Sequence, residues 1–339
     1  MNRQSRREFL NRALVASTAG ILCPRTSAAE PPPETGRLRI QTRLTICEAP
    51  SYVAEELLRA EGFSEITYLK LHQLATGRWE NPEERLISGE ADVMIDFSPD
   101  AIVQIDAGAP VVFLSGVHVG CIEVFAGDRV RAISDLKGKT LIVWSLGTST
   151  HLFFAMIAAH VGLDAARDVN WNVNPKIEEW PRLLQERKID AFLGFPPLSQ
   201  EMRAKGIGRV LMKSLTDRPW SQYFCCMVVG NKEFVRRNPI ATKRAVRAIL
   251  KASELCALQP DKTAKLLVDK GYVERNDYAV ESMTEVAYGK RRDYEPADAI
   301  RFYALRLHET GMIKSSPQKI IAHGTDWRFL NELKKELKG

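Results

Sequence analysis

The chain has 339 residues, of which 45% are hydrophobic, and this length is enough for two compact lobes. Its formal net charge of +6 arises largely at the N-terminus, because residues 1–29 hold five arginines and one glutamate. The remaining residues have 43 basic and 41 acidic side chains, a net charge of +2. Without a basic stripe interleaved with aromatic residues, the composition argues against nucleic-acid binding, and no segment after residue 29 is long and apolar enough to be a transmembrane helix.

The first 29 residues have the order of an export signal. Residues 5–10 include Arg6 and Arg7, residues 13–22 are apolar, and residues 27–29 are small. The paired arginines followed by Phe9 and Leu10 resemble a twin-arginine signal. We therefore expect the twin-arginine translocase to export the folded chain to the periplasm, with cleavage near Ala29. The alternative is a basic N-terminal helix of the mature fold.

Beyond a proline-stiffened linker at residues 30–36, short apolar strands alternate with amphipathic helices. The pattern predicts strands at 38–47, 66–71, 91–97, 111–115, 141–144, 168–174, 189–194 and 210–214. Helices are predicted at 51–61, 82–88, 100–107, 150–161, 180–187 and 198–205, and residues from 232 onward are almost entirely helical. Strands of this kind indicate mostly parallel sheets covered on both faces.

Two extended segments, 121–126 and 222–230, separate the two α/β units. They predict two lobes joined by two crossing strands, with 37–121 and 227–339 in lobe 1 and 122–226 in lobe 2. Ligands of open α/β sheets bind beyond the carboxyl ends of the strands. We therefore expect a cleft between the lobes that closes by hinge motion around a small molecule.

Several short motifs resemble periplasmic solute-binding proteins of the nitrate/sulfonate/taurine type, which feed ABC importers. They lie, in order, at residues 86–93, 107–111, 135–139, 162–164, 188–192 and 234–239. The resemblance extends over residues 38–270 and implies a type II two-lobe binding-protein fold, ligand binding without chemistry, and ABC permease subunits as partners. Fungal thiamine-pyrimidine synthases share this superfamily.

The sequence lacks the motifs of the common enzyme classes. It has no HExxH, GxSxG or GxxxxGK[ST] motif, and no GxGxxG motif after a strand. Cys225 and Cys226 are adjacent, a poor spacing for one metal ion. We therefore expect neither catalysis, nor a cofactor, nor a metal. The five cysteines beyond residue 29 are scattered and odd in number, which favours buried free thiols.

In lobe 2 the candidate site is the turn from Gly147 through Thr148 and Ser149 to Thr150. It follows a strand and begins a helix, so its free N–H groups and hydroxyls suit an anionic group, and the resemblance implies ligand contacts there. The alternative is a simple helix cap. Phe195 could form an apolar wall.

In lobe 1 the candidates follow the strand ends. Tyr52 could stack on a ligand or pack within the lobe. Asp96, in a strand end that continues to Ser98, could accept a ligand N–H or cap a helix, and His118 could bind the ligand or be structural. Tyr223, on the returning crossing strand, could face the cleft or the core.

The sequence thus predicts a monomeric periplasmic binding protein for an ABC importer, with a small organic anion or a heteroaromatic compound as ligand. Asp96 and Glu123 leave an amphoteric ligand open. The alternatives are an exported sensory or accessory binding protein and a thiamine-pyrimidine synthase-like enzyme. Such synthases carry a run of several cysteines, which the pair Cys225 and Cys226 resembles only weakly.

Overall fold

The structure, a computed structural model, describes residues 30–43, 45–71, 81–273 and 276–336, so the predicted export signal lies outside the described residues. Pro33–Gly339 form one compact unit. Among the described helices, none is long and apolar enough to cross a membrane.

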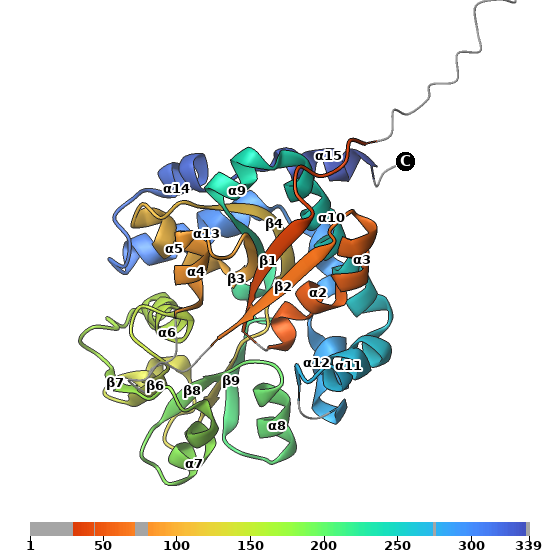
Figure 1. Cartoon of the computed structure of the whole chain (residues 1–339). Helices are drawn as coiled ribbons and strands as arrows, with labels where there is room; N and C mark the ends of the chain where they lie inside the picture. Colours follow the sequence, from red (N-terminus) through yellow and green to blue (C-terminus); the bar gives the residue numbers. More distant parts are fainter. Residues whose placement is uncertain (1–29, 44, 72–80, 274–275, 337–339) are drawn as a thin grey trace, which may run out of the picture. The chain divides into compact units, whose positions relative to one another are not determined.

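The first of two five-stranded sheets has the order β2-β1-β3-β10-β4 (Figure 1). Strands β2, β1 and β3 are parallel neighbours, and β10 pairs antiparallel with β3 and β4. Every residue of β3, β4 and β10 is buried, as expected for strands covered on both faces of the sheet. The strands are β1 (Arg37–Thr42), β2 (Glu65–Lys70), β3 (Val93–Phe97), β4 (Val111–Val119) and β10 (Phe224–Asn231).

The second sheet has the order β7-β6-β8-β5-β9, with β7, β6 and β8 parallel and β5 antiparallel to β8 and β9. Its core includes Trp180, packed with Phe125 and Phe192. The strands are β5 (Glu123–Ala126), β6 (Thr140–Val143), β7 (Asn170–Val173), β8 (Ala191–Gly194) and β9 (Arg209–Lys213). The prediction of a two-lobe α/β fold is confirmed.

Helices connect the strands within each lobe. Those of the first lobe before the crossing are η1 (Ile46–Glu48), α2 (Ala49–Val53), α3 (Glu55–Ala60), α4 (Pro82–Ser88) and α5 (Ser98–Asp106). Those between β5 and β10 are η2 (Ile133–Leu136), α6 (Ser149–His160), η3 (Ile177–Glu179), α7 (Trp180–Gln185), α8 (Leu198–Ala204) and η4 (Trp220–Gln222).

The C-terminal third is helical, as predicted, and packs mainly on the first lobe through contacts of α10 with α2 and of α13 with α5. The carboxylate of Glu34, within the predicted linker, accepts hydrogen bonds from Ile240 N and Ala241 N at the start of α10. The elements are α9 (Lys232–Arg237), α10 (Pro239–Leu258), α11 (Pro260–Asp269), α12 (Asn276–Glu285), η5 (Tyr288–Asp293), α13 (Pro296–Glu309), α14 (Pro317–Gly324) and α15 (Arg328–Glu336).

The first strand is shorter than the predicted 38–47, because a helical turn interrupts it. Thr45 caps η1 by accepting a hydrogen bond from Cys47 N, and Pro50 then occupies the first turn of α2, where its missing N–H is tolerated. Because β1 ends early, Arg43 and residues 45–48 lie outside the strand at the carboxyl edge of the sheet, the last three of them in η1.

The chain passes between the sheets twice, from β4 to β5 and from β9 to β10. Ser214 joins the two crossings, since its hydroxyl accepts hydrogen bonds from Cys121 N (3.1 Å) and Ile122 N (2.8 Å). Its own N–H donates to Ile122 O at 2.8 Å. Gly120 has a φ of +45°, and an added Cβ would lie 2.4 Å from the Cα of Leu215. The crossings are therefore in direct backbone contact.

Candidate functional site

A pocket of about 380 Å³ lies at the carboxyl ends of strands from both sheets. The first lobe lines it through Phe97, Asp100, the start of α4 and four residues that follow β1, namely Arg43, Thr45, Cys47 and Glu48. The second lobe lines it through Trp144, the start of α6, Ile177 and residues 195–198. Thr45 Oγ1 donates to Pro196 O at 3.2 Å, a contact between the two walls.

The first-lobe wall is built around Arg43. Its guanidinium donates to Asp96 Oδ1 at 2.6 Å, to Glu48 Oε1 at 3.2 Å and to Glu83. The backbone N–H of Arg43 also donates to Glu48 Oε2 at 2.8 Å. Asp100, at the start of α5, lines the pocket beside this group.

Burial raises the pKa of three carboxyl groups in this wall, those of Glu48, Glu83 and Asp100. Burial raises the pKa of Glu48 to about 7 despite the attraction of Arg43. Burial, reinforced by repulsion from Asp96, raises the pKa of Glu83 to about 7, and burial together with Glu83 raises that of Asp100 well above its usual value. Although burial disfavours its charge, the surrounding carboxylates raise the pKa of Arg43 well above its usual value.

One guanidinium cannot balance four carboxyl groups in a buried wall. Asp100 Oδ1 is buried and lacks a hydrogen-bond partner among the described residues. An unpaired buried oxygen of this kind is unfavourable. This side of the pocket therefore favours a ligand group that donates hydrogen bonds or carries positive charge.

The second-lobe wall has the opposite character. Helix α6 begins at Ser149, with Thr148 at its N-cap, and both residues line the pocket with Thr150. Thr150 Oγ1 accepts from Trp144 N, and Thr148 Oγ1 donates to Ser145 O at 2.8 Å. The first N–H groups of a helix attract negative charge. This wall therefore suits an anionic group of a ligand.

Four of the ten predicted ligand residues line the pocket: Thr148, Ser149, Thr150 and Phe195. Gly147 is adjacent to them, and its φ of +82° lets the turn form, but it is not in the lining. Asp96 lies behind the lining and reaches it through Arg43. We propose that the four lining residues contact the ligand and that Gly147 and Asp96 hold the lining in position.

The other predicted residues make contacts elsewhere. Tyr52 is buried and stacks on Tyr272 at 3.7 Å between ring centroids, and Tyr223 stacks on Phe302 at 4.0 Å. Ser98 Oγ donates to Phe224 O at 2.8 Å. These contacts agree with the packing alternatives stated for Tyr52 and Tyr223.

His118 and Glu123 also lie outside the lining. His118 is buried in the first sheet beside Tyr288, and Glu123 pairs with Arg203 on α8. Glu123 therefore already has a cationic partner of its own.

The charged residues of the first wall were not predicted from the sequence: Arg43, Glu48, Glu83 and Asp100. No motif marks them, because Arg43 lies within a segment predicted as strand and meets partners up to 53 residues away. The only local signal is Asp100, which directly follows the predicted strand end at Phe97, Ser98 and Pro99.

Comparison with known proteins agrees with the fold. The model of the NMT1-like family matches residues 69–268, and no curated protein matches the chain. The periplasmic nitrate-binding protein of Synechocystis PCC 6803 superposes with a TM-score of 0.73 at 14% identity, over 91% of this chain and 90% of that one.

Two further solved structures have the same fold. The alkanesulfonate-binding protein of Xanthomonas axonopodis pv. citri, bound to MOPS, gives a TM-score of 0.64 at 16% identity, over 85% of this chain and 96% of that one. A Candida albicans gene product with the generic periplasmic binding protein fold gives 0.67 at 14% identity, over 86% and 96%. The family model spans more than half of the chain, and the chain therefore belongs to the NMT1-like family and has the two-lobe fold of the periplasmic binding proteins.

Proposed function

We propose that this protein is the substrate-binding component of an ABC importer and captures one small molecule between its lobes. The observation that carries the proposal is the pocket formed where the carboxyl ends of both sheets meet. Structural neighbours named as nitrate- and alkanesulfonate-binding proteins have the same two-lobe fold and support it. Permease subunits in the inner membrane would be the partners, and binding would proceed without catalysis.

The ligand we propose is amphoteric, a small organic or heteroaromatic molecule with an anionic group and hydrogen-bond donors. The start of α6 would hold the anionic group, while Asp100 and the carboxyl groups around Arg43 would accept from the donors. Phe97, Trp144 and Phe195 add apolar surface suited to a flat ring. Neither wall alone accounts for such a ligand.

We further propose that the twin-arginine translocase exports the folded precursor, that its signal is then cleaved near Ala29, and that the mature chain is a periplasmic monomer. Its lobes would comprise 37–121 with 227–339, and 122–226. The two crossings joined by Ser214 would act as the hinge.

The test is native mass spectrometry of the protein purified from its own host, followed by denaturation to release and identify any bound compound. We expect one small amphoteric molecule per chain, and titration of that compound should raise the melting temperature. A strain lacking the gene should lose uptake of the compound. Binding without an uptake defect would instead indicate a sensory or accessory binding protein, and a compound converted on incubation would indicate an enzyme.

A further inference from the structure

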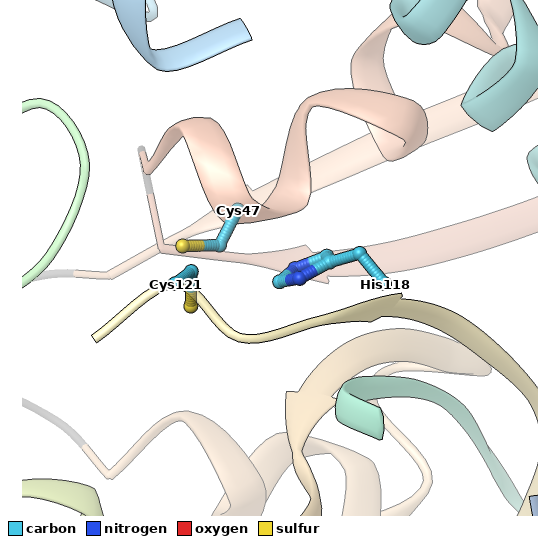
Figure 2. Close-up of side chains that lie close together, drawn as sticks. All are labelled: Cys47, His118 and Cys121. Carbon is cyan, nitrogen blue, oxygen red and sulfur yellow. The ribbon is translucent and has the colours of Figure 1, made fainter. Parts of the chain in front are cut away.

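Four segments of the chain bring five soft metal-ligand side chains together beside the pocket. Cys47 comes from η1, His118 from β4, Cys121 from the first crossing, and Cys225 with Cys226 from the start of β10. All five residues are buried. The ligand atoms of Cys47, His118 and Cys121 lie within 4.8 Å of one another, and so do those of Cys121, Cys225 and Cys226. Figure 2 shows the first three side chains converging from separate stretches of the ribbon.

We propose that this group, the thiol–imidazole cluster, binds a single thiophilic d10 metal ion, Zn²⁺ or Cu⁺, through Cys121 and its neighbours. Cys121 belongs to both sets of three ligands and is therefore the central donor. The proposal rests on the cluster alone and is independent of which small molecule the pocket holds.

The sulfur separations fit one ion. Two thiolates bound tetrahedrally at about 2.3 Å from a zinc ion lie about 3.8 Å apart. Cys121 Sγ lies 3.3 Å from Cys225 Sγ, and Cys225 Sγ lies 4.0 Å from Cys226 Sγ, so the observed spacings bracket that value. Binding would need only small side-chain movements.

His118 supplies an independent indication. Its Nε2 is buried and has no hydrogen-bond partner among the described residues, while its Nδ1 lies 3.4 Å from Val119 O. An imidazole that ligates a metal commonly donates its other ring N–H to a backbone carbonyl. The same arrangement here would satisfy both ring nitrogens, with Nε2 on the ion and Nδ1–H directed at Val119 O.

The chemistry of the donors indicates the class of ion, and the neighbouring pocket gives the ion access to the cluster. Thiolates and imidazole favour Zn²⁺ and Cu⁺ over the oxygen-seeking Mg²⁺ and Ca²⁺. Cys47, Cys121 and Cys226 line the pocket, so an ion can reach the cluster through it. Two thiolates would neutralise Zn²⁺, which suits a buried position.

The test uses the full-length protein, reduced and stripped with a chelator under anaerobic conditions. Zn²⁺ and Cu⁺ are then titrated separately in competition with a chromophoric chelator for each. We expect one ion per chain with sub-micromolar affinity, and the arm that binds more tightly identifies the ion. Replacement by Co²⁺ should give thiolate-to-cobalt charge-transfer absorption, which reports sulfur ligation directly.

Cys121→Ala should weaken binding by roughly 100-fold or more and abolish the charge-transfer band. Cys256→Ala is the matched control, because Cys256 is a buried free cysteine on α10 outside the cluster. If Cys121→Ala does not fold, Cys121→Ser serves in its place, because it keeps the size of the side chain but removes the sulfur that both sets of ligands share. Binding that Cys121→Ala or Cys121→Ser leaves intact would overturn the proposal. So would a reduced protein that takes up neither ion, or a Cys121–Cys225 disulfide found by peptide mapping of the protein as isolated.

Discussion

Glu83 shows how burial changes the chemistry of a single side chain in this pocket. It is ion-paired with Arg43, yet burial and the nearby Asp96 raise its pKa to about 7. The guanidinium is shared with Glu48 and Asp96 and cannot offset the desolvation of every partner. The protonation of the acidic wall therefore changes near neutral pH, where the protein is expected to bind its ligand.

Glu83→Gln should make the stability of the ligand-free protein less dependent on pH. Because the pKa of Glu83 is raised on folding, the folded state holds the extra proton between pH 4.5 and about 7. Stability is thus favoured at low pH and falls as the pH rises through this window. The free energy of unfolding, measured by urea titration at several pH values, should fall less steeply with pH in the variant. The slope should be smaller by up to about 1.4 kcal/mol per pH unit. An unchanged slope would show that Glu83 is ionised throughout.

Ser149→Asp should separate ligand binding from folding. The new carboxylate would occupy the place proposed for the ligand's anionic group, and two like charges about 4 Å apart near a protein surface repel by about 4 kcal/mol. Affinity should fall by roughly two to three orders of magnitude, while an acidic residue in the first helical turn leaves the melting temperature equal or slightly higher.

The control for this substitution is Ser316→Asp, at the N-cap of α14 and outside the pocket lining. It should change neither stability nor affinity appreciably. If Ser149→Asp retains its affinity for the identified ligand, the turn is only a helix cap.

At the scale of elements, the two crossings between the sheets are held closely against each other. Gly120 takes a left-handed conformation and lies against the backbone of Ser214 and Leu215, where an added Cβ would come within 2.6 Å of three atoms. Such contacts cannot be relieved by rotating a side chain, so β4 and β9 end in fixed relation to each other.

Gly120→Ala should destabilise the protein more than Gly138→Ala does. Both glycines have positive φ values, +45° and +72°, but an added Cβ at Gly138 meets nothing within 4 Å. Gly138→Ala should therefore show only the conformational penalty of about 1–2 kcal/mol, and Gly120→Ala a further ~1–3 kcal/mol from overpacking. Equal losses in chemical denaturation would mean that the crossings can move apart.

At the scale of the whole molecule, the sequence predicted what local signals determine. Helix α4 has the predicted bounds because Asn81 caps it, Pro82 begins it and Gly89 ends it in a left-handed conformation. The turn before α6 was found for the same reason, as a strand, small polar residues and a helix start follow one another. Alternation of strands and helices then sufficed for the two-lobe fold.

The sequence could not predict contacts made between distant segments. Tyr52 is adjacent to a strand end, but its stacking partner Tyr272 is 220 positions away in the printed sequence. The thiols likewise have no motif spacing, since Cys47, Cys121 and Cys225 come from segments that are far apart in the sequence. Residues that the fold brings together from distant segments have no regular spacing in the sequence, so a periodic pattern cannot reveal them.

Export can be tested on the whole chain. Changing both Arg6 and Arg7 to Lys should leave the precursor in the cytoplasm, because the twin-arginine pair is the proposed targeting signal. Cell fractionation with an antibody to the protein measures this, and the circular dichroism of the retained protein should match that of the parent. Undiminished periplasmic yield would assign export to another pathway.

The hydroxyl of Ser214 limits how the lobes can separate. Because it accepts from Cys121 N and Ile122 N, and Ser214 N donates to Ile122 O, the two crossings are tied into one strap at the level of the backbone. In the proposed hinge closure, two independent connections would let the lobes move in several ways, whereas one strap would leave mainly a single rotation. Each ligand contact with either wall would then shift the same equilibrium between open and closed lobes, so weak contacts on opposite walls would add to one another.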